Sequence, residues 1–244
     1  HNFLETNGIT ENTIVIFTTD NGAEVFTWPD GGMTPFRGAK GSVLEGGMRV
    51  PMLVQWPGHI PAGQVENGLM SGLDWMQTLV AVAGNSNISE ELKKGKIMNG
   101  ETYKVHLDGY NQLDMLTGNG ESNRDTIYYF AQHELGAVRV GDYKYRFIDQ
   151  PNGWFGETVN LQMPAITNLR LDPFERAGWS DNTNEGSVSF FNYFVYEFWR
   201  FVDSQNAVEE LVETFIEFPP MQEPASFNLD SVKQKIQKMK SLGE

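Results

Sequence analysis

An acidic and an amide side chain follow directly on an apolar run near the start of the sequence. Residues 12–19 (NTIVIFTT) are β-branched and apolar on both faces, which is typical of a central strand in a parallel sheet. The run ends in Asp20, Asn21 and Gly22. At the carboxyl edge of such a sheet, a carboxylate and an amide oxygen suit a hard divalent cation better than Zn²⁺. The alternative interpretation is a plain turn, because Asp-Asn-Gly is also favourable turn chemistry.

A glycine-rich loop further along the chain carries a second group of polar residues. Residues 35–51 (PFRGAKGSVLEGGMRVP) place Arg37, Lys40, Glu45 and Arg49 among glycines. Glycines allow the backbone to approach a ligand closely, and a lysine on such a loop is a point charge for an anion. Glu45 and Arg49 are four residues apart and can pair to brace the loop. A solvated basic loop is the other interpretation.

Two further elements must position these loops. Residues 51–58 (PMLVQWPG) read as a second short buried strand, and residues 71–84 (SGLDWMQTLVAVAG) as a helix that ends at Gly84. The face of this helix that we predict to be buried consists of Leu73, Met76, Leu79, Val80 and Ala83. The order strand, loop, strand, helix predicts the end of an α/β sheet.

The pattern changes in the second half of the chain. Residues 85–122 are polar and rich in glycine, and we place a boundary there, which divides the chain into 1–110 and 111–244. Short segments with close turn signals then predict an antiparallel sheet over 126–131, 136–141, 143–149 and 165–171. Helices are expected to follow at the aromatic run 190–202, at 207–218 and at 231–242. Arg139 and Lys144 fall on the expected sheet and read as solvent-facing, with substrate contact as the alternative.

Composition excludes several classes of protein. The 244 residues have a formal charge of −14, which argues against nucleic acid as a partner. The absence of cysteine excludes disulfides, thiolate metal sites and a cysteine nucleophile within these residues. No apolar run reaches the length of a membrane span. The oligomeric state stays open.

Three motifs, in this order, resemble the type I sulfatase (arylsulfatase) family of the alkaline-phosphatase superfamily. They are TTDNG, FRGAKGSVLEGGMRVPMLVQWPGHIPAG and LDWMQTLVAVAG. Four later segments are similar to the C-terminal part of bacterial arylsulfatases: VHLDGYNQLDMLTG, AVRVGDYKYRF, NLRLDPFERAG and FPPMQEPASFNLD. The resemblance covers nearly the whole chain but only the second half of a family member.

The resemblance implies roles for three residues. Asp20 and Asn21 match metal ligands that usually bind Ca²⁺, with Mg²⁺ as the alternative, and Lys40 matches the lysine that holds the sulfate group. Arg37, Glu45 and Arg49 match the same loop and read as structural. The family nucleophile is a formylglycine made from Cys or Ser in Cys/Ser-x-Pro-x-Arg, and no serine of this chain begins that motif. None of the four histidines matches the family's catalytic histidines.

The expected protein is therefore a portion of a sulfuric ester hydrolase that uses a divalent cation. The implied fold is α/β, with part of an alkaline-phosphatase-like mixed sheet followed by a small antiparallel sheet and C-terminal helices. A sulfated small molecule or glycan is the implied substrate, and export to the periplasm or outside the cell is the implied location. We expect the chain alone to bind Ca²⁺ weakly and to be inactive. The alternatives are a phosphodiesterase or phosphatase of the same superfamily, and a non-catalytic binding module.

Overall fold

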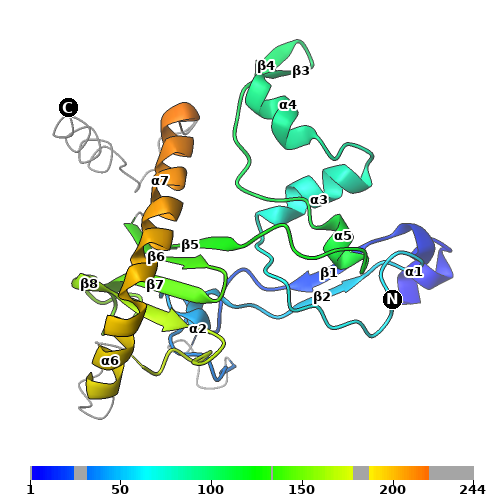
Figure 1. Ribbon diagram of the computed structural model, residues 1–244. Helices are drawn as coiled ribbons and strands as arrows, with labels where there is room; N and C mark the ends of the chain where they lie inside the picture. The colour runs from blue at the N-terminus through cyan, green and yellow to red at the C-terminus, as the bar shows by residue number, and fades with distance from the viewer. Residues whose placement is uncertain (1, 25–31, 133, 178–186, 220–244) are drawn as a thin grey trace.

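The computed structural model describes residues 2–24, 32–132, 134–177 and 187–219, without the side chains of 187–190 (Figure 1). The helices in these ranges are α1 (Asn2–Thr6), η1 (Thr10–Asn12), α2 (Glu45–Met48), α3 (Asp74–Val82), α4 (Ile88–Lys94), α5 (Leu113–Leu116), α6 (Ser187–Glu197), η2 (Phe198–Arg200) and α7 (Phe201–Glu217). The strands are β1 (Val15–Thr18), β2 (Met52–Gln55), β3 (Lys96–Met98), β4 (Glu101–Tyr103), β5 (Thr126–Ala131), β6 (Glu134–Val140), β7 (Tyr143–Asp149) and β8 (Val159–Asn168). The expected helix at 231–242 lies outside the described residues.

The antiparallel sheet predicted for the second half is confirmed. Its four strands lie in the order β5-β6-β7-β8, and each pairs antiparallel with the next. Gly141 turns the chain between β6 and β7 with φ +56°, a left-handed conformation that glycine adopts without strain. β8 begins at Val159, earlier than the predicted start at residue 165. Its first half, VNLQM, alternates apolar and polar residues, so this strand signal was present in the sequence.

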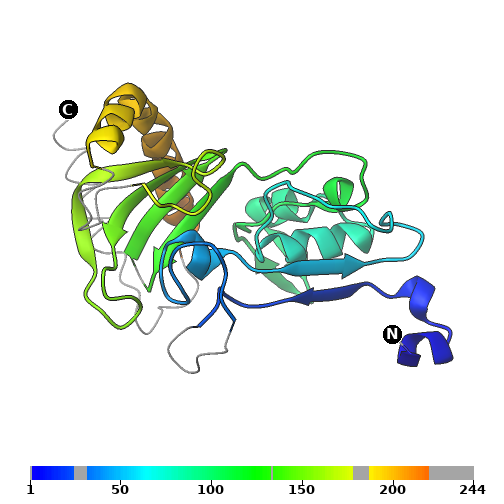
Figure 2. The same cartoon turned by 90° about the horizontal axis from the view of Figure 1, so that it is seen from below.

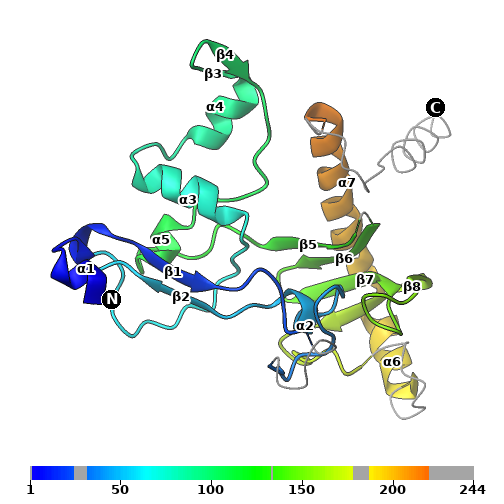
Figure 3. The ribbon, with the colours of Figure 1, turned by 180° about the vertical axis from the view of Figure 1, so that it is seen from behind.

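This sheet is covered on both faces. Helices α6 and α7 lie along one face, and the loop with α2 lies against the other (Figures 1 and 3). On the helix face, Tyr145 and Phe194 belong to one buried cluster. On the loop face, Val43 packs into a second cluster that includes Tyr129 and Ile148. The loop predicted to carry chemistry is thus anchored in the core of the C-terminal sheet.

The aromatic run 190–202 forms the predicted helix, but only part of it is packed. Phe194 is buried against the sheet, and Tyr128 donates a hydrogen bond from its hydroxyl to the Ala207 carbonyl of α7 at 2.8 Å. Several large side chains of the same segment stay exposed, namely Phe191, Val195, Tyr196, Phe198, Trp199 and Val202. The helical packing predicted for this run therefore holds for one side of α6.

The strand before Asp20 differs from the prediction in pairing and burial. β1 pairs with β2, and the pair is antiparallel, so the expected parallel neighbour is not found among the described residues. Phe17 and Leu53 are cross-strand partners and are 62% and 69% exposed, while α3 and α5 lie over the opposite side (Figure 2). Apolar residues on both faces indicate what a strand is able to bury, but not the direction of its neighbours.

Helix α3 is confirmed, and Gly84 follows its end with φ +98°. The predicted buried face is wrong, because Leu73, Met76 and Leu79 are exposed. The residues that α3 buries are polar: Asp74, Gln77 and Thr78. A buried ion pair described below accounts for this reversal, since it holds the polar side of the helix against the rest of the chain.

The segment between the two sheets contains a hairpin that the sequence analysis did not identify. β3 and β4 pair antiparallel around Asn99 and Gly100, both with positive φ. Asn-Gly is a strong signal for a two-residue hairpin turn, so it was available in the sequence. The boundary proposed after residue 110 stays a prediction. Polar contacts cross it, including a hydrogen bond of 2.9 Å from the backbone N–H of Gln112 to the Thr78 hydroxyl.

Candidate active site

The turn after β1 is fixed by a close approach of two backbones. Asp20 is exposed and Asn21 is half-buried. The next residue, Gly22, donates its N–H to the Gly47 carbonyl at 2.9 Å. A Cβ atom at Gly22 would lie 1.9 Å from the Gly46 carbonyl oxygen, so no other residue fits without moving the backbone. The glycine after Asp20 and Asn21 is therefore what allows their turn to touch the glycine-rich loop.

A second backbone bond brings Lys40 to the same place. The Lys40 N–H donates to the Ala23 carbonyl at 2.9 Å, so the turn and the loop run side by side. The Lys40 ammonium forms an ion pair with Glu24 at 3.0 Å and lies 5.1 Å from the centre of the Trp154 ring. The structure thus places Asp20, Asn21 and Lys40 on adjacent loops, with the Lys40 charge already paired.

The predicted brace within the loop is present. Arg49 Nε donates to Glu45 Oε2 at 2.8 Å across the i, i+4 spacing. Glu45 Oε1 also accepts from the Tyr129 hydroxyl at 2.9 Å and from Lys144 Nζ at 3.0 Å. The structural role read for this carboxylate therefore extends beyond the loop to the C-terminal sheet.

Glu175 closes the same cluster from the far end of the chain. It accepts the Glu45 backbone N–H at 2.6 Å and pairs with Lys144 at 2.9 Å. Arg37 donates to the Glu175 carbonyl at 3.1 Å. We call the group of Glu45, Arg49, Tyr129, Lys144 and Glu175 the Glu45 cluster.

Electrostatics in this cluster favour the ionised carboxylate. Burial alone would raise the pKa of Glu45, but the charge of Lys144 and the hydrogen bonds from Arg49, Lys144 and Tyr129 outweigh it. The pKa of Glu45 is therefore lowered from its ordinary value of 4.5. Burial, and then the neighbouring charge of Glu45, raise the pKa of Tyr129 well above its ordinary value. Tyr129 thus remains a hydrogen-bond donor at neutral pH.

The solvent-facing interpretation of Lys144 is wrong. Its side chain is 1% exposed and is held between two carboxylates, so substrate contact is also excluded in this arrangement. Alternation on a strand cannot reveal that a loop from an earlier part of the chain will cover a charge. Arg139, its cross-strand partner, is half-buried and donates to the Gly141 carbonyl at 2.7 Å.

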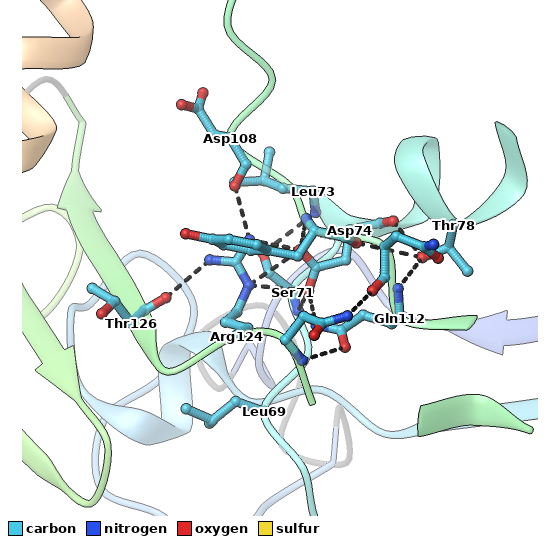
Figure 4. Close-up of polar contacts among 12 residues, drawn as sticks. Leu69, Ser71, Leu73, Asp74, Thr78, Asp108, Gln112, Arg124 and Thr126 are labelled. Carbon is cyan, nitrogen blue, oxygen red and sulfur yellow. Dashed lines mark hydrogen bonds and ion pairs between the residues drawn. The ribbon is translucent and has the colours of Figure 1, made fainter. Parts of the chain in front are cut away.

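A second buried ion pair lies near the start of α3 (Figure 4). Arg124 Nη2 is 2.6 Å from Asp74 Oδ1, and Arg124 Nε lies within 3.1 Å of both carboxylate oxygens. Asp74 also accepts the backbone N–H groups of Tyr110 and Ser71, each at 2.8 Å. This arrangement, which we call the Asp74 cluster, joins α3 to the segment before β5. Both side chains are almost fully buried and are satisfied within the chain, which indicates a structural role.

The remaining histidines contribute little to the candidate site. His59 is exposed and stacks on Trp56 with ring centres 3.8 Å apart. His106 contacts Asp108 at 3.1 Å. His1 and His133 lie outside the described residues. Within the described ranges, no group of three or more His, Cys, Asp or Glu side chains is arranged to hold a metal ion.

The donors present fit a hard cation in type but not in number. Asp20 offers carboxylate oxygens and Asn21 an amide oxygen, both of which Ca²⁺ and Mg²⁺ prefer. Calcium takes about six to eight oxygen ligands, so these two residues are part of a ligand set. Cation binding by Asp20 and Asn21 therefore stays a proposal.

Comparison with known proteins now identifies the family. The Sulfatase family matches residues 2–85. N-acetylgalactosamine-6-sulfatase of Canis lupus familiaris is 33% identical over 190 residues, which are 69% of this chain and 34% of that protein. Arylsulfatase A of Homo sapiens is 37% identical over 168 residues, which are 66% of this chain and 30% of that protein. The chain belongs to the sulfatase family.

Solved structures agree with this assignment. The crystal structure of PsFucS1 sulfatase from Pseudoalteromonas sp. matches with a TM-score of 0.72 and 30% identity over 91% of this chain and 41% of that one. The sulfatase fold predicted from the motifs, with its alkaline-phosphatase-like architecture, is thereby confirmed. The chain spans about a third of the length of the curated relatives that it matches. Among the described residues, no helix has the length and apolarity needed to cross a membrane.

Proposed function

We propose that this chain is part of a sulfatase that hydrolyses sulfate monoesters with the help of a divalent cation. Asp20 and Asn21 would hold the cation, and Lys40 would bind the sulfate group. The observation that carries the proposal is the pair of backbone bonds, Gly22 to Gly47 and Lys40 to Ala23, in a sulfatase-family chain. These bonds bring the proposed cation ligands and the proposed sulfate ligand onto adjacent loops.

The proposed chemistry is electrostatic. A sulfate monoester carries negative charge on the oxygens around a weakly electrophilic sulfur, and this charge impedes attack. Bound Ca²⁺ would offset that charge as a Lewis acid. The Lys40 ammonium would donate hydrogen bonds to the same oxygens from a fixed position, which needs little reorganisation during reaction. A sulfated small molecule or a sulfated glycan is the proposed substrate class.

Lys40 must exchange its partner when a sulfate binds. In the structure its ammonium is paired with Glu24 at 3.0 Å. Both side chains are partly exposed, and such pairs contribute about 0 to 1 kcal/mol, so a sulfate group can displace the carboxylate. In this proposal the Glu24 carboxylate occupies the position next to the Lys40 ammonium that the sulfate group would take.

The chain is not proposed to act alone. Its 244 residues contain no cysteine and no serine that begins Ser-x-Pro-x-Arg, so they supply no precursor of formylglycine. Two proposed cation ligands also predict weak Ca²⁺ binding. We expect the isolated chain to bind Ca²⁺ in the millimolar range and to leave aryl sulfates uncleaved.

Calorimetric titration with Ca²⁺ and an aryl sulfate assay test this proposal together. Asp20→Ala should abolish the weak Ca²⁺ binding, whereas Asp114→Ala, at another exposed aspartate, should preserve it. Lys40→Ala should lower the affinity for inorganic sulfate, and Lys94→Ala, at an exposed lysine of α4, should not. Equal Ca²⁺ binding by the wild type and by Asp20→Ala would exclude a cation site at Asp20. Cleavage of the aryl sulfate by the wild-type chain, above the rate of Lys40→Ala, would contradict the expectation that the isolated chain is inactive.

A further inference from the structure

Six Asn-Gly pairs occur in the chain, and one of them lies at the proposed cation site. The glycine that follows Asn21 is buried, whereas the glycines of the other five pairs are exposed. The same dipeptide thus occurs in two environments, and this difference affects a reaction that Asn-Gly undergoes without an enzyme. The asparagines of the six pairs are Asn7, Asn21, Asn67, Asn99, Asn119 and Asn152.

The reaction is the loss of ammonia from the asparagine side chain. The glycine nitrogen attacks the side-chain carbonyl carbon of the asparagine and forms a new C–N bond, which closes a succinimide ring. The side-chain nitrogen leaves as ammonia and takes the proton of the glycine N–H. Water then opens the ring at either carbonyl and leaves aspartate or isoaspartate. Glycine favours the attack because it has no side chain to hinder the approach and restricts the backbone least.

The nitrogen that would attack Asn21 is held in a hydrogen bond. The Gly22 N–H donates to the Gly47 carbonyl at 2.9 Å, and a Cβ atom at Gly22 would lie 1.9 Å from the Gly46 carbonyl oxygen. The Gly22 nitrogen therefore cannot lose its proton and move toward the Asn21 side chain while the turn contacts the glycine-rich loop. The reaction requires a local opening that separates the two loops, and the free energy of that opening lowers its rate.

The glycines after Asn99 and Asn119 lack this restraint. Gly100 lies in the turn of the β3–β4 hairpin, and Gly120 lies in the segment after α5. Neither N–H donates a hydrogen bond to any other residue that the structure describes. Both asparagines are exposed, but the Asn119 side-chain nitrogen donates to the Thr117 hydroxyl at 2.9 Å. We therefore expect Asn99 to react first and Asn119 second.

The remaining three pairs have only local hydrogen bonds. The N–H groups of Gly8 and Gly153 each donate at 3.0 Å to a carbonyl three residues earlier, and the Gly68 N–H donates at 2.9 Å to the Glu66 side chain. These bonds break without separating distant parts of the chain, and all three glycines are exposed. Their asparagines should therefore react at intermediate rates, faster than Asn21.

We propose that spontaneous deamidation of this chain begins at Asn99 and Asn119, and that the bond from Gly22 to Gly47 protects Asn21 from it. This inference goes beyond the proposed function and does not depend on it, because the reaction needs no bound cation. If Asn21 is a cation ligand, the protection also preserves that ligand. Isoaspartate would add a carbon to the backbone and move the side-chain oxygen away from its position beside Asp20.

Peptide mapping by mass spectrometry, after incubation of the full chain at mildly alkaline pH, measures deamidation at each site. The same incubation in guanidinium chloride gives the rates in the unfolded chain. The ratio of the unfolded to the folded rate should be below about threefold at Asn99 and above about tenfold at Asn21, which corresponds to an opening free energy above about 1.4 kcal/mol. Asn99→Ser is the control, and it should remove the first site without changing the rates at Asn21 and Asn119.

Hydrogen exchange measured by nuclear magnetic resonance tests the cause at the same nitrogen atoms. The Gly22 N–H should be protected at least as strongly as Asn21 is, and the Gly100 N–H should exchange as in the unfolded chain. Equal deamidation of Asn21 and Asn99 in the folded chain would overturn the proposal. Slow deamidation of Asn21 together with fast exchange at Gly22 would also overturn it, because the bond to Gly47 would then not be the cause.

Discussion

Asp74 and Glu45 are both almost fully buried, but their partners come from different parts of the molecule. Asp74 pairs with Arg124 and takes backbone bonds from Ser71 and Tyr110, all outside the loop that carries Lys40. Glu45 is itself in that loop. Its partners include residues of β5, β7 and the segment after β8. We therefore expect the Asp74 cluster to contribute only to the stability of the fold. We expect the Glu45 cluster to contribute both to stability and to anion binding at the Lys40 loop.

Loss of Asp74 gives the largest expected effect. Asp74→Ala leaves the Arg124 guanidinium buried without its carboxylate partner. It also leaves without an acceptor the backbone N–H groups that donate hydrogen bonds to Asp74. Removing one partner of a buried pair costs about 3 to 5 kcal/mol, and we expect the upper part of this range in the free energy of unfolding by urea. Sulfate affinity below the unfolding transition should be unchanged. Asp114→Ala is the control, and a loss of sulfate affinity in Asp74→Ala would remove the distinction between the clusters.

Loss of Lys144 comes next. Lys144→Met leaves Glu45 with Arg49 and Tyr129 but takes the cation away from Glu175. We expect destabilisation of about 3 kcal/mol, at the lower end for a broken buried pair, together with weaker sulfate binding in the folded chain. Lys94→Met provides an exposed-lysine control. Unchanged sulfate affinity would show that the cluster does not position the Lys40 loop.

The pH dependence of stability sharpens the comparison further. The pKa of Glu45 is lowered in the folded chain, so its stabilising contribution is present above the ordinary value of 4.5 and is lost as the pH falls through the lowered pKa. In this window the unfolded chain binds more protons, and the free energy of unfolding should fall with decreasing pH. Glu45→Gln should make this fall shallower in urea titrations. Parallel curves for the variant and the wild type would contradict the assignment.

Removal of Glu24 gives the smallest expected effect. Glu24→Gln abolishes the ion pair to Lys40 and leaves the ammonium available to an anion. Because partly exposed pairs contribute up to about 1 kcal/mol, sulfate affinity should rise about two- to fivefold in calorimetric titrations. Glu121→Gln, at an exposed glutamate, is the control. A decrease in affinity would mean that Glu24 supports the site instead of competing for it.

The sequence allowed good prediction where local pattern determines structure. Alternation and the turn at Gly141 placed the strands β5 to β7, and Gly84 marked the end of α3. The motifs also located the two loops of the candidate site. These features depend on neighbours along the chain, which a single sequence displays directly.

The failures concern contacts between distant parts of the chain. Lys144 on a strand was predicted to face solvent, and Asp74 on a helix was not singled out. Each is buried by a partner far away in the sequence. Likewise, no motif predicted that Trp154 lies beside Lys40. The exposed side of β1–β2 could not be predicted either, because pattern shows which residues are able to be buried and not what covers them.

The exposed pair of Phe17 and Leu53 also affects how sulfate binding should be measured. Apolar surface of this kind favours association between molecules, and sulfate strengthens it by being excluded from protein surfaces. Added sulfate should therefore promote association of the chain through β1–β2 at the same time as it binds at the site proposed around Lys40. Titrations compared at constant water activity, with a second excluded but non-binding solute such as sucrose as the reference, separate these two effects of one ion.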